Sequence, residues 1–87
     1  MPALSGQVVV VTGASSGIGE AIARRLVRVG AKVVITARRP EQLNSLAREL
    51  DSSGANVLAM VGDITSDTDR RALVAGALKK FGRIDAL

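Results

Sequence analysis

Four consecutive valines, Val8 to Val11, lead directly into a glycine-rich segment that runs from Thr12 to Gly19. A short β-branched run bounded by glycine is typical of a strand that is buried on both faces. The three glycines of the segment weaken regular structure, so we expect them where the chain turns tightly or where something must approach the backbone closely. The pattern therefore predicts a strand, a tight turn and the first turn of a helix, in that order.

Strand and helix patterns alternate along the rest of the chain. Strands are expected at residues 7–12, 32–36 and 56–61, and each is followed by apolar residues at helical spacing. The third helix should begin at Ser66 or Asp67 and end at Gly82. The residues expected on the buried sides of the helices are Ile18, Ile22 and Leu26, then Leu43, Leu46, Ala47 and Leu50, then Val74, Ala77, Leu78 and Phe81.

This βαβαβα order predicts an α/β fold in which a parallel sheet lies between layers of helices. We expect residues 1–87 to form one such unit, half of a Rossmann fold, as a single domain. We see no internal linker, low-complexity tract or extra domain in the pattern.

The composition excludes several classes of function. The chain has no Cys and no His, which argues against a disulfide framework, thiol chemistry or a transition-metal site. It has neither an apolar run long enough to cross a bilayer nor a signal-peptide pattern, so we expect a cytoplasmic protein that does not bind membranes. The net charge is +4, but the basic residues are spread over separate helices, so nucleic acid is not an expected partner.

The glycine-rich segment has features of a phosphate site. Its spacing, Gly-x-x-x-Gly-x-Gly, lacks the Gly-Lys-Ser/Thr ending of an ATP-type loop, which disfavours an NTPase. We expect Gly13 to allow the turn, Gly17 to let a pyrophosphate approach, and Gly19 to let the helix pack against the strand. The helix N-terminus would attract the phosphates. A merely tight strand–helix connection is the alternative.

The segment from Thr12 to Gly19 resembles the TGxxxGIG motif of the classical short-chain dehydrogenases/reductases, which are NAD(P)(H)-dependent oxidoreductases with a Rossmann fold. The resemblance extends over the whole chain: residues 30–38 are similar to that family's second strand, 62–65 to its adenine-contacting loop, and 81–87 to the entry of its fourth strand. It implies the N-terminal, cofactor-binding half of the fold, with strand order 3-2-1 and a stub of a fourth strand. The cofactor-binding residues implied are Gly13, Ser15, Ser16, Gly17, Ile18, Gly19, Arg38, Arg39, Asp63 and Ile64.

The end of the second strand bears on which cofactor is bound. Members of the family that bind NAD carry an acidic residue where this chain has Ala37, and a carboxylate there would repel a 2′-phosphate. Arg38 and Arg39 instead offer charge-assisted hydrogen bonds to that phosphate, so we expect NADP(H) to be preferred over NAD(H). A solvated pair of arginines is the alternative.

The loop after the third strand is expected to receive the adenine ring. By resemblance, Asp63 accepts a hydrogen bond from the adenine amino group, and the region of Ile64 covers the ring. The alternative for Asp63 is a local role in capping a turn, which is common for aspartate.

The catalytic Ser, Tyr and Lys of the family lie beyond its fourth strand, and this sequence stops at Leu87. The 87 residues also contain no Tyr and no His to act as an acid or base near neutral pH. We therefore expect an NADP(H)-binding module with no catalytic residues and no enzymatic activity of its own. The alternative is a self-assembling structural fragment, or an ancestral or designed half-domain, with negligible cofactor binding. The chain could also be the product of a natural open reading frame that was cut short.

The first strand should lie at an edge of the sheet, with only residues 84–87 available to cover it. A valine-rich edge without Lys or Pro is a template for pairing with another chain. We therefore expect a homodimer, formed by antiparallel pairing of two first strands or by exchange of the C-terminal segment.

Overall fold

In a computed structural model of the chain, which describes residues 6–14 and 17–86, three strands alternate with three helices. The elements are β1 (Val8–Thr12), α1 (Gly17–Arg28), β2 (Lys32–Ala37), α2 (Pro40–Leu50), β3 (Val57–Val61) and α3 (Asp67–Phe81). All strand pairs are parallel, and β2 lies between β1 and β3. The predicted α/β fold and its strand order are confirmed.

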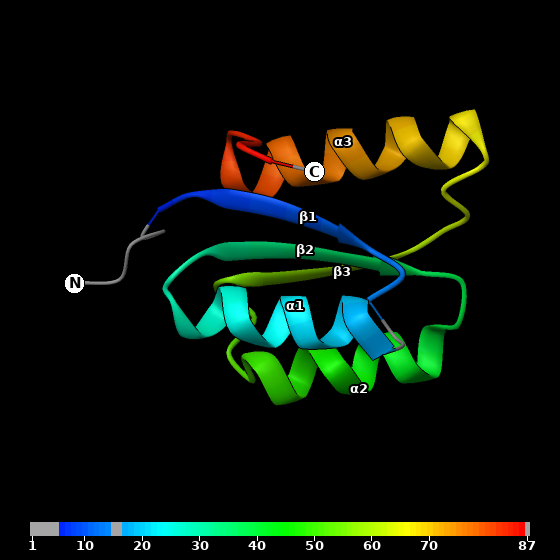
Figure 1. Cartoon of the computed structure of the whole chain (residues 1–87). Helices are drawn as coiled ribbons and strands as arrows, with labels where there is room; N and C mark the ends of the chain where they lie inside the picture. Colours follow the sequence, from blue (N-terminus) through cyan, green and yellow to red (C-terminus); the bar gives the residue numbers. More distant parts are fainter. Residues whose placement is uncertain (1–5, 15–16, 87) are drawn as a thin grey trace.

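The sheet is the middle of three layers. Helices α1 and α2 cover one face, and α3 covers the other (Figure 1). Consecutive strand residues point to opposite faces, so β2 contributes Val33 and Ile35 to the core beneath α1 and α2, and Val34 to the core beneath α3. All three side chains are fully buried, which explains the continuous apolar run of this strand.

The ends of α3 are as the sequence predicts. Ser66 is the N-cap, and its hydroxyl oxygen accepts a hydrogen bond from the backbone N–H of Asp69. Gly82 follows the last turn in the left-handed conformation, with φ of 79°. In α2 the predicted apolar side also holds, because Leu43 and Leu46 are buried against the sheet.

The buried side of α1 differs from the prediction. Ile18 and Ile22 are 80% and 46% exposed, whereas Ala23 is fully buried and Leu26 packs against the core. The cause is the position of β1 at the edge of the sheet. The two isoleucines lie beside that edge and line a hollow along β1, so no described residue packs over them from outside.

The buried side of α3 also differs. Val74 and Leu78 are 42% and 46% exposed, whereas Leu73 and Ala77 are buried. Gly76 allows α3 to approach the sheet closely, because a Cβ there would meet the end of the Met60 side chain of β3.

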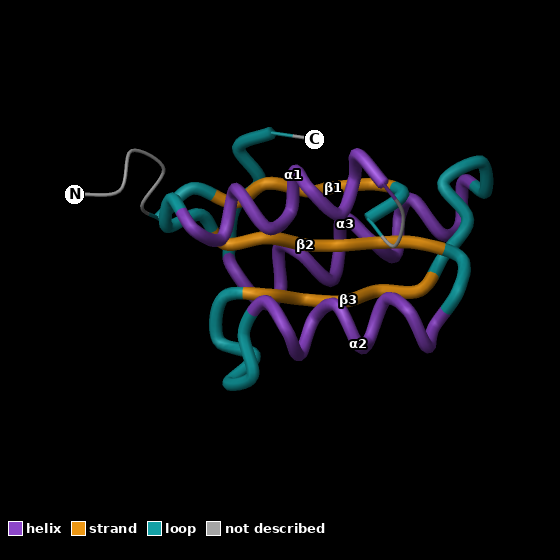
Figure 2. Tube along the Cα trace, turned by 60° about the horizontal axis from the view of Figure 1, so that its bottom comes forward, coloured by secondary structure: helices purple, strands orange, loops and turns teal. Residues whose placement is uncertain are grey.

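Residues near the C-terminus pair with β1 (Figure 2). Ala86 forms a parallel bridge with Val9, and the N–H of Val10 donates to the carbonyl of Ala86 at 3.0 Å. The carboxylate of Asp85 accepts from the N–H of Val8 at 2.8 Å. These contacts begin a fourth parallel strand next to β1, which is the predicted stub.

Within the described ranges, no helix is long and apolar enough to cross a membrane.

Candidate functional site

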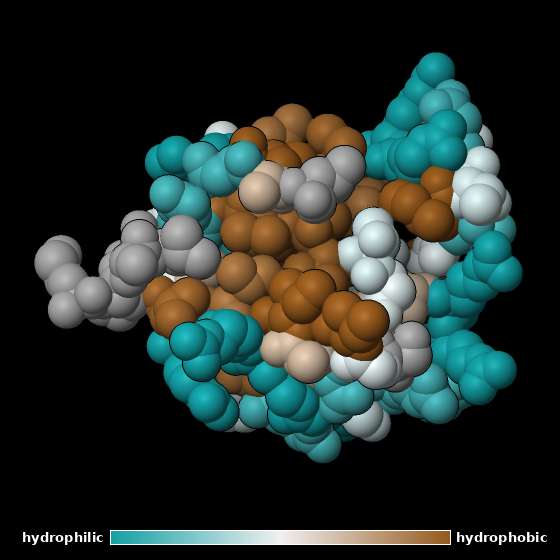
Figure 3. Space-filling model, in the orientation of Figure 1, coloured by the Kyte–Doolittle hydropathy of each residue, from teal (hydrophilic) through white to brown (hydrophobic). Residues whose placement is uncertain are grey.

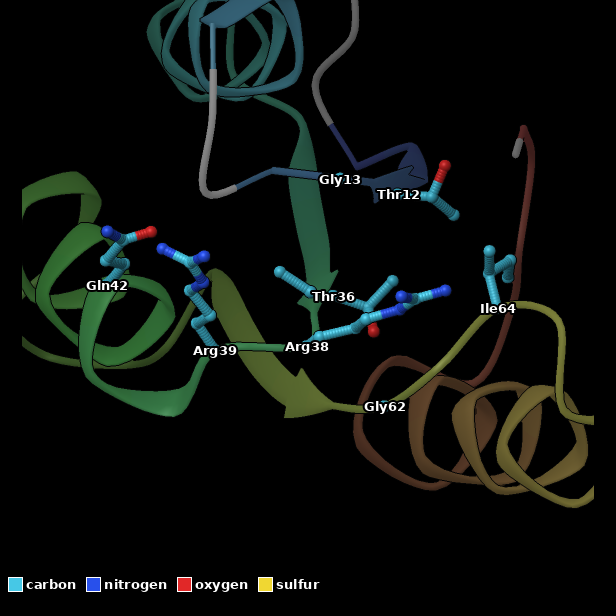
Figure 4. Close-up of a pocket in the computed structure, with 9 residues that line it drawn as sticks. Thr12, Gly13, Thr36, Arg38, Arg39, Gln42, Gly62 and Ile64 are labelled. Atoms are coloured by element: carbon cyan, nitrogen blue, oxygen red, sulfur yellow. The ribbon is translucent and has the colours of Figure 1, made fainter.

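A hollow of about 460 Å³ lies at the carboxyl end of the sheet, where the loops that follow the three strands meet (Figure 4). Ligands of open α/β sheets bind at this edge, because the connecting loops diverge there. The residues that line the hollow are Thr12, Gly13, Thr36, Ala37, Arg38, Arg39, Gln42, Gly62 and Ile64.

The turn between β1 and α1 forms one side of the hollow. Gly13 has φ of 64°, in the left-handed region that favours glycine. The N–H of Ala14 then donates to the carbonyl of Thr36 at 3.2 Å, which ties the turn to β2. Two of the predicted site residues, Ser15 and Ser16, lie outside the described residues.

The remaining glycines of the turn differ in their surroundings. A Cβ at Gly19 would overlap the carbonyl oxygen of Gly13, so the helix can pack here only if residue 19 is glycine. Gly17 has φ of 39°, and among the described residues, apart from its chain neighbours and its own helix, no atom lies within 4 Å of the position that its Cβ would take. The backbone at Gly17 is therefore open to an incoming group, and the backbone at Gly19 is closed by packing.

Two arginines stand directly after β2, which ends at Ala37, one residue beyond the predicted strand. The guanidinium of Arg38 reaches Asp63, with Nη2 and Oδ1 3.3 Å apart, and its side chain is 71% exposed. Arg39 is the N-cap residue of α2, and its side chain makes no capping bond. In Figure 4, Arg39 lies next to Gln42 on one side of the hollow, and Arg38 extends toward Ile64 on the other.

Asp63 lies at the border of the hollow, between the lining residues Gly62 and Ile64. Its Oδ1 accepts hydrogen bonds from the Thr65 hydroxyl at 2.6 Å and the Thr65 N–H at 2.9 Å, in addition to the contact with Arg38. The hydroxyl bond, the N–H bond and the nearby guanidinium hold the pKa of Asp63 below its ordinary value. Asp63 is therefore an ionised acceptor near neutral pH.

The structure brings together some of the predicted residues and separates others. Those that line the hollow are Gly13, Arg38, Arg39 and Ile64. Asp63 borders the hollow, and Gly17 does not line it. Gly19 packs beneath the turn, and Ile18 and Gly19 line the separate hollow along β1.

Sequence reasoning missed Thr36 and Gln42, which also line the hollow. Gln42 follows Arg39 by three residues, a spacing that places two side chains on the same side of a helix, so this signal was available. Thr36 is the one polar residue between Val33 and Ala37 of a buried strand and is only 6% exposed. Both residues add polar groups to the side of the hollow for which the sequence analysis named only Arg38 and Arg39.

A glycine-rich strand–helix turn, a parallel sheet and a hollow at its carboxyl edge define a dinucleotide-binding α/β fold. The chain matches the family model of the short chain dehydrogenases over residues 7–87, and it belongs to that family.

Known proteins of the family resemble the chain closely. It is 43% identical over 83 residues to the A-factor type gamma-butyrolactone 1′-reductase of Streptomyces virginiae, covering 95% of this chain and 32% of the relative. A solved metagenomic short-chain oxidoreductase in complex with NADP is 46% identical with a TM-score of 0.85, over 97% of this chain and 38% of that one. The 3-ketoacyl-(acyl-carrier-protein) reductase of Brucella melitensis, complexed with NADH, is 41% identical with a TM-score of 0.88. The match covers 95% of this chain and 33% of that one.

The chain thus spans about a third of the length of these relatives. The matched third is the part that forms the turn, the hollow and the first three strands.

Proposed function

We propose that the chain binds the adenosine and phosphate portion of NADP(H) and prefers it to NAD(H). The observation that carries this proposal is the lining of the hollow. Two guanidinium groups, of Arg38 and Arg39, line it directly after β2, and no carboxylate is among the described residues of the lining. A cationic wall of this kind favours a 2′-phosphate, whereas a carboxylate at the end of β2 would favour free ribose hydroxyls.

Each part of the cofactor has a group in the chain suited to it. The open backbone at Gly17 and the N-terminus of α1 suit the pyrophosphate. The space between Arg38 and Ile64 suits the adenine ring, with Asp63 beside it as the acceptor for an amino group. Among the structural neighbours, one binds NADP and another NADH, so the preference for NADP(H) rests on the residues of this chain.

When bound, the nicotinamide ring gives or accepts a hydride. The residues of this chain would hold the opposite end of the cofactor and orient it at the edge of the sheet. No Tyr or His occurs in the 87 residues to supply or remove the accompanying proton. We therefore propose a binding role for this chain, with no turnover by the chain alone.

The direct test is a calorimetric comparison of NADP⁺ and NAD⁺ at matched ionic strength. We expect NADP⁺ to bind with a dissociation constant on the order of 0.1 to 1 mM, equivalent to about 4 to 5.5 kcal/mol, because only part of the usual contacts is available. NAD⁺ should bind several-fold more weakly. Equal affinities would overturn the preference, and no binding of either would overturn the function.

A second candidate function, self-assembly, is favoured by a separate observation on β1. Figure 3 shows an apolar surface over this strand, and the exposed Ile18 and Ile22 border it. Asp85 and Ala86 occupy only the first half of the outer edge. The carbonyl of Val10 and the N–H of Thr12 have no hydrogen-bond partner among the described residues.

We propose a second copy of the chain as the occupant of this edge. A two-fold axis at Val11 would place Val10 of one copy opposite Thr12 of the second copy, and the reverse. The open carbonyl of Val10 would then accept from the N–H of Thr12 of the second copy. Ala86 already lies beside Val9, and its carbonyl accepts from the Val10 N–H, so this pairing requires the C-terminal segment to move away from the edge. This is the antiparallel pairing expected from the sequence. Exchange of the C-terminal segment is the other arrangement.

A further inference from the structure

The loop that carries Asp63 is held by a second carboxylate, that of Asp69 in the first turn of α3. The Oδ2 atom of Asp69 accepts a hydrogen bond from the backbone N–H of Asp63 at 2.8 Å, in a partly buried position. The backbone N–H of Asp69 donates to the Ser66 hydroxyl at 3.2 Å, and the N–H of Ser66 donates to the carbonyl of Asp63 at 2.9 Å. The main chain of Asp63 is therefore fixed on both its N–H and its C=O side.

The carboxylate of Asp63 is fixed as well, but on one oxygen only. Its Oδ1 is occupied by the hydroxyl and the N–H of Thr65 and by Arg38. Its Oδ2 has no hydrogen-bond partner among the described residues. With the backbone anchored and Oδ1 occupied, Oδ2 is the oxygen left for a donor that enters from outside.

Ordinary helix capping does not account for the bond made by Asp69. The residue stands at the third helical position after the N-cap Ser66, where an acidic side chain usually reaches back to the N–H of the cap itself. Here the Ser66 N–H goes to the carbonyl of Asp63, and Asp69 reaches past the cap to the N–H of Asp63. The side chain therefore acts on the loop beside the hollow.

We propose that Asp69 is a positioning residue for adenine recognition, which it serves by fixing the backbone of Asp63 so that the free carboxylate oxygen meets the exocyclic amino group. The inference rests on the proposed function, because it assumes that adenine occupies the hollow. Asp69 touches no part of the cofactor. Its effect is to remove conformations of the loop in which Asp63 faces away, and such preorganisation raises affinity without a new contact.

The test compares NADP⁺ with its hypoxanthine analogue, in which a carbonyl oxygen replaces the amino group of adenine. We expect the parent chain to bind NADP⁺ about threefold to tenfold more tightly than the analogue, as one hydrogen bond would give. Asp69→Ala should bring this ratio close to one, mainly by weakening NADP⁺. Asp69→Asn should keep most of the ratio, because an amide oxygen can also accept from the Asp63 N–H.

Asp67→Ala is the matched control. Asp67 stands in the same first turn of α3, and its charge interacts favourably with the helix dipole in the same way. It pairs with Arg70 and Arg71, of which Arg70 also donates to the Ile64 carbonyl, but among the described residues no hydrogen bond joins Asp67 itself to the loop. It should leave the ratio unchanged. A merely structural defect would weaken both ligands equally and would not move the ratio.

Hydrogen exchange of the Asp63 amide in the ligand-free proteins adds an independent measurement. Exchange should accelerate in Asp69→Ala and not in Asp67→Ala. If Asp69→Ala binds both ligands with the parent's ratio, the inference is wrong and the proposed function stands. If the parent binds neither ligand, the proposed function fails, and this inference fails with it.

Discussion

Gly19 of α1 lies against the carbonyl group of Gly13, so closely that a Cβ at Gly19 would overlap the carbonyl oxygen and stand 2.8 Å from the carbonyl carbon. At Gly17, two residues earlier, no other described segment lies within 4 Å of the position that a Cβ would take. Two glycines of one motif therefore have different physical roles. Gly19 permits the packing of the helix on the turn, and Gly17 leaves room for a ligand.

Valine substitutions at these two glycines should separate the roles. Gly19→Val should lower the free energy of unfolding by about 1 to 3 kcal/mol or more, because the branched side chain must displace backbone. Gly17→Val should abolish measurable NADP⁺ binding, and it should also lower the free energy of unfolding, because φ is 39° at this position and a β-branched residue is strained there. Urea denaturation and calorimetry on both variants provide the measurements. Unchanged affinity in a folded Gly17→Val protein would remove the phosphate role from the turn.

The two arginines after β2 allow a test of cofactor choice. Arg38→Ala should erase the preference for NADP(H) over NAD(H), because the substitution removes a charge-assisted donor to the 2′-phosphate. The affinity for NAD⁺ should change little. Arg48→Ala, an exposed arginine in α2 that does not line the hollow, is the control for net charge. The assignment of Arg38 would be wrong if parent and variant discriminate between the cofactors equally.

The fold could be predicted from the sequence because short apolar runs alternate with helical patterns. β1 and β2 are β-branched runs that are largely buried, whereas β3 is only partly buried and was located by the alternation. The buried sides of the helices could be predicted only where the sheet extends beneath them. Leu43 and Leu46 of α2 pack in the core with Val33 and Ile35 of β2 and Val57 of β3, and are buried as expected. Ile18 of α1 lies beside an edge strand and is exposed, and no periodicity shows where a sheet ends.

The candidate site could be predicted only in part, because motifs locate residues but do not show contacts between distant segments. Resemblance to the family's motifs located Gly13, Arg38 and Ile64, which line the hollow. It could not show that Arg38 pairs with Asp63, because that contact joins the ends of two different strands across 25 positions of sequence. Nor did it reveal Asp69, whose part depends on a hydrogen bond to a loop backbone six residues away.

The purified chain should not oxidise NADPH in the presence of aldehydes or ketones above the uncatalysed background. The reason is the absence of Tyr and His from the 87 residues, which leaves no acid or base suited to neutral pH. The absorbance of NADPH at several pH values is a sufficient assay. Turnover that follows the protein through purification and is lost in Gly17→Val would overturn this expectation.

Self-association through β1 should depend on the apolar surface beside that strand. We expect light scattering to show a dimer whose population rises with concentration, and Ile22→Glu to shift it toward monomer by adding two like charges near the two-fold axis. Val74→Glu is the control, because it places the same charge at a comparably exposed position on α3, away from β1. It should not change the average molecular mass measured by light scattering. A parent chain that stays monomeric over the accessible concentrations would show that Asp85 and Ala86 protect the edge sufficiently.

The central claim is that the hollow at the carboxyl edge of the sheet binds the adenosine end of NADP(H). Titration of the isotopically labelled chain with NADP⁺, followed by amide chemical shifts, tests it most directly. The account predicts saturable shifts confined to Gly13, Gly17, Gly19 and the loops at Arg38 and Ile64, with a dissociation constant on the order of 0.1 to 1 mM. Absence of saturation far above that range, or shifts spread over the basic helix surfaces instead of the hollow, would contradict it.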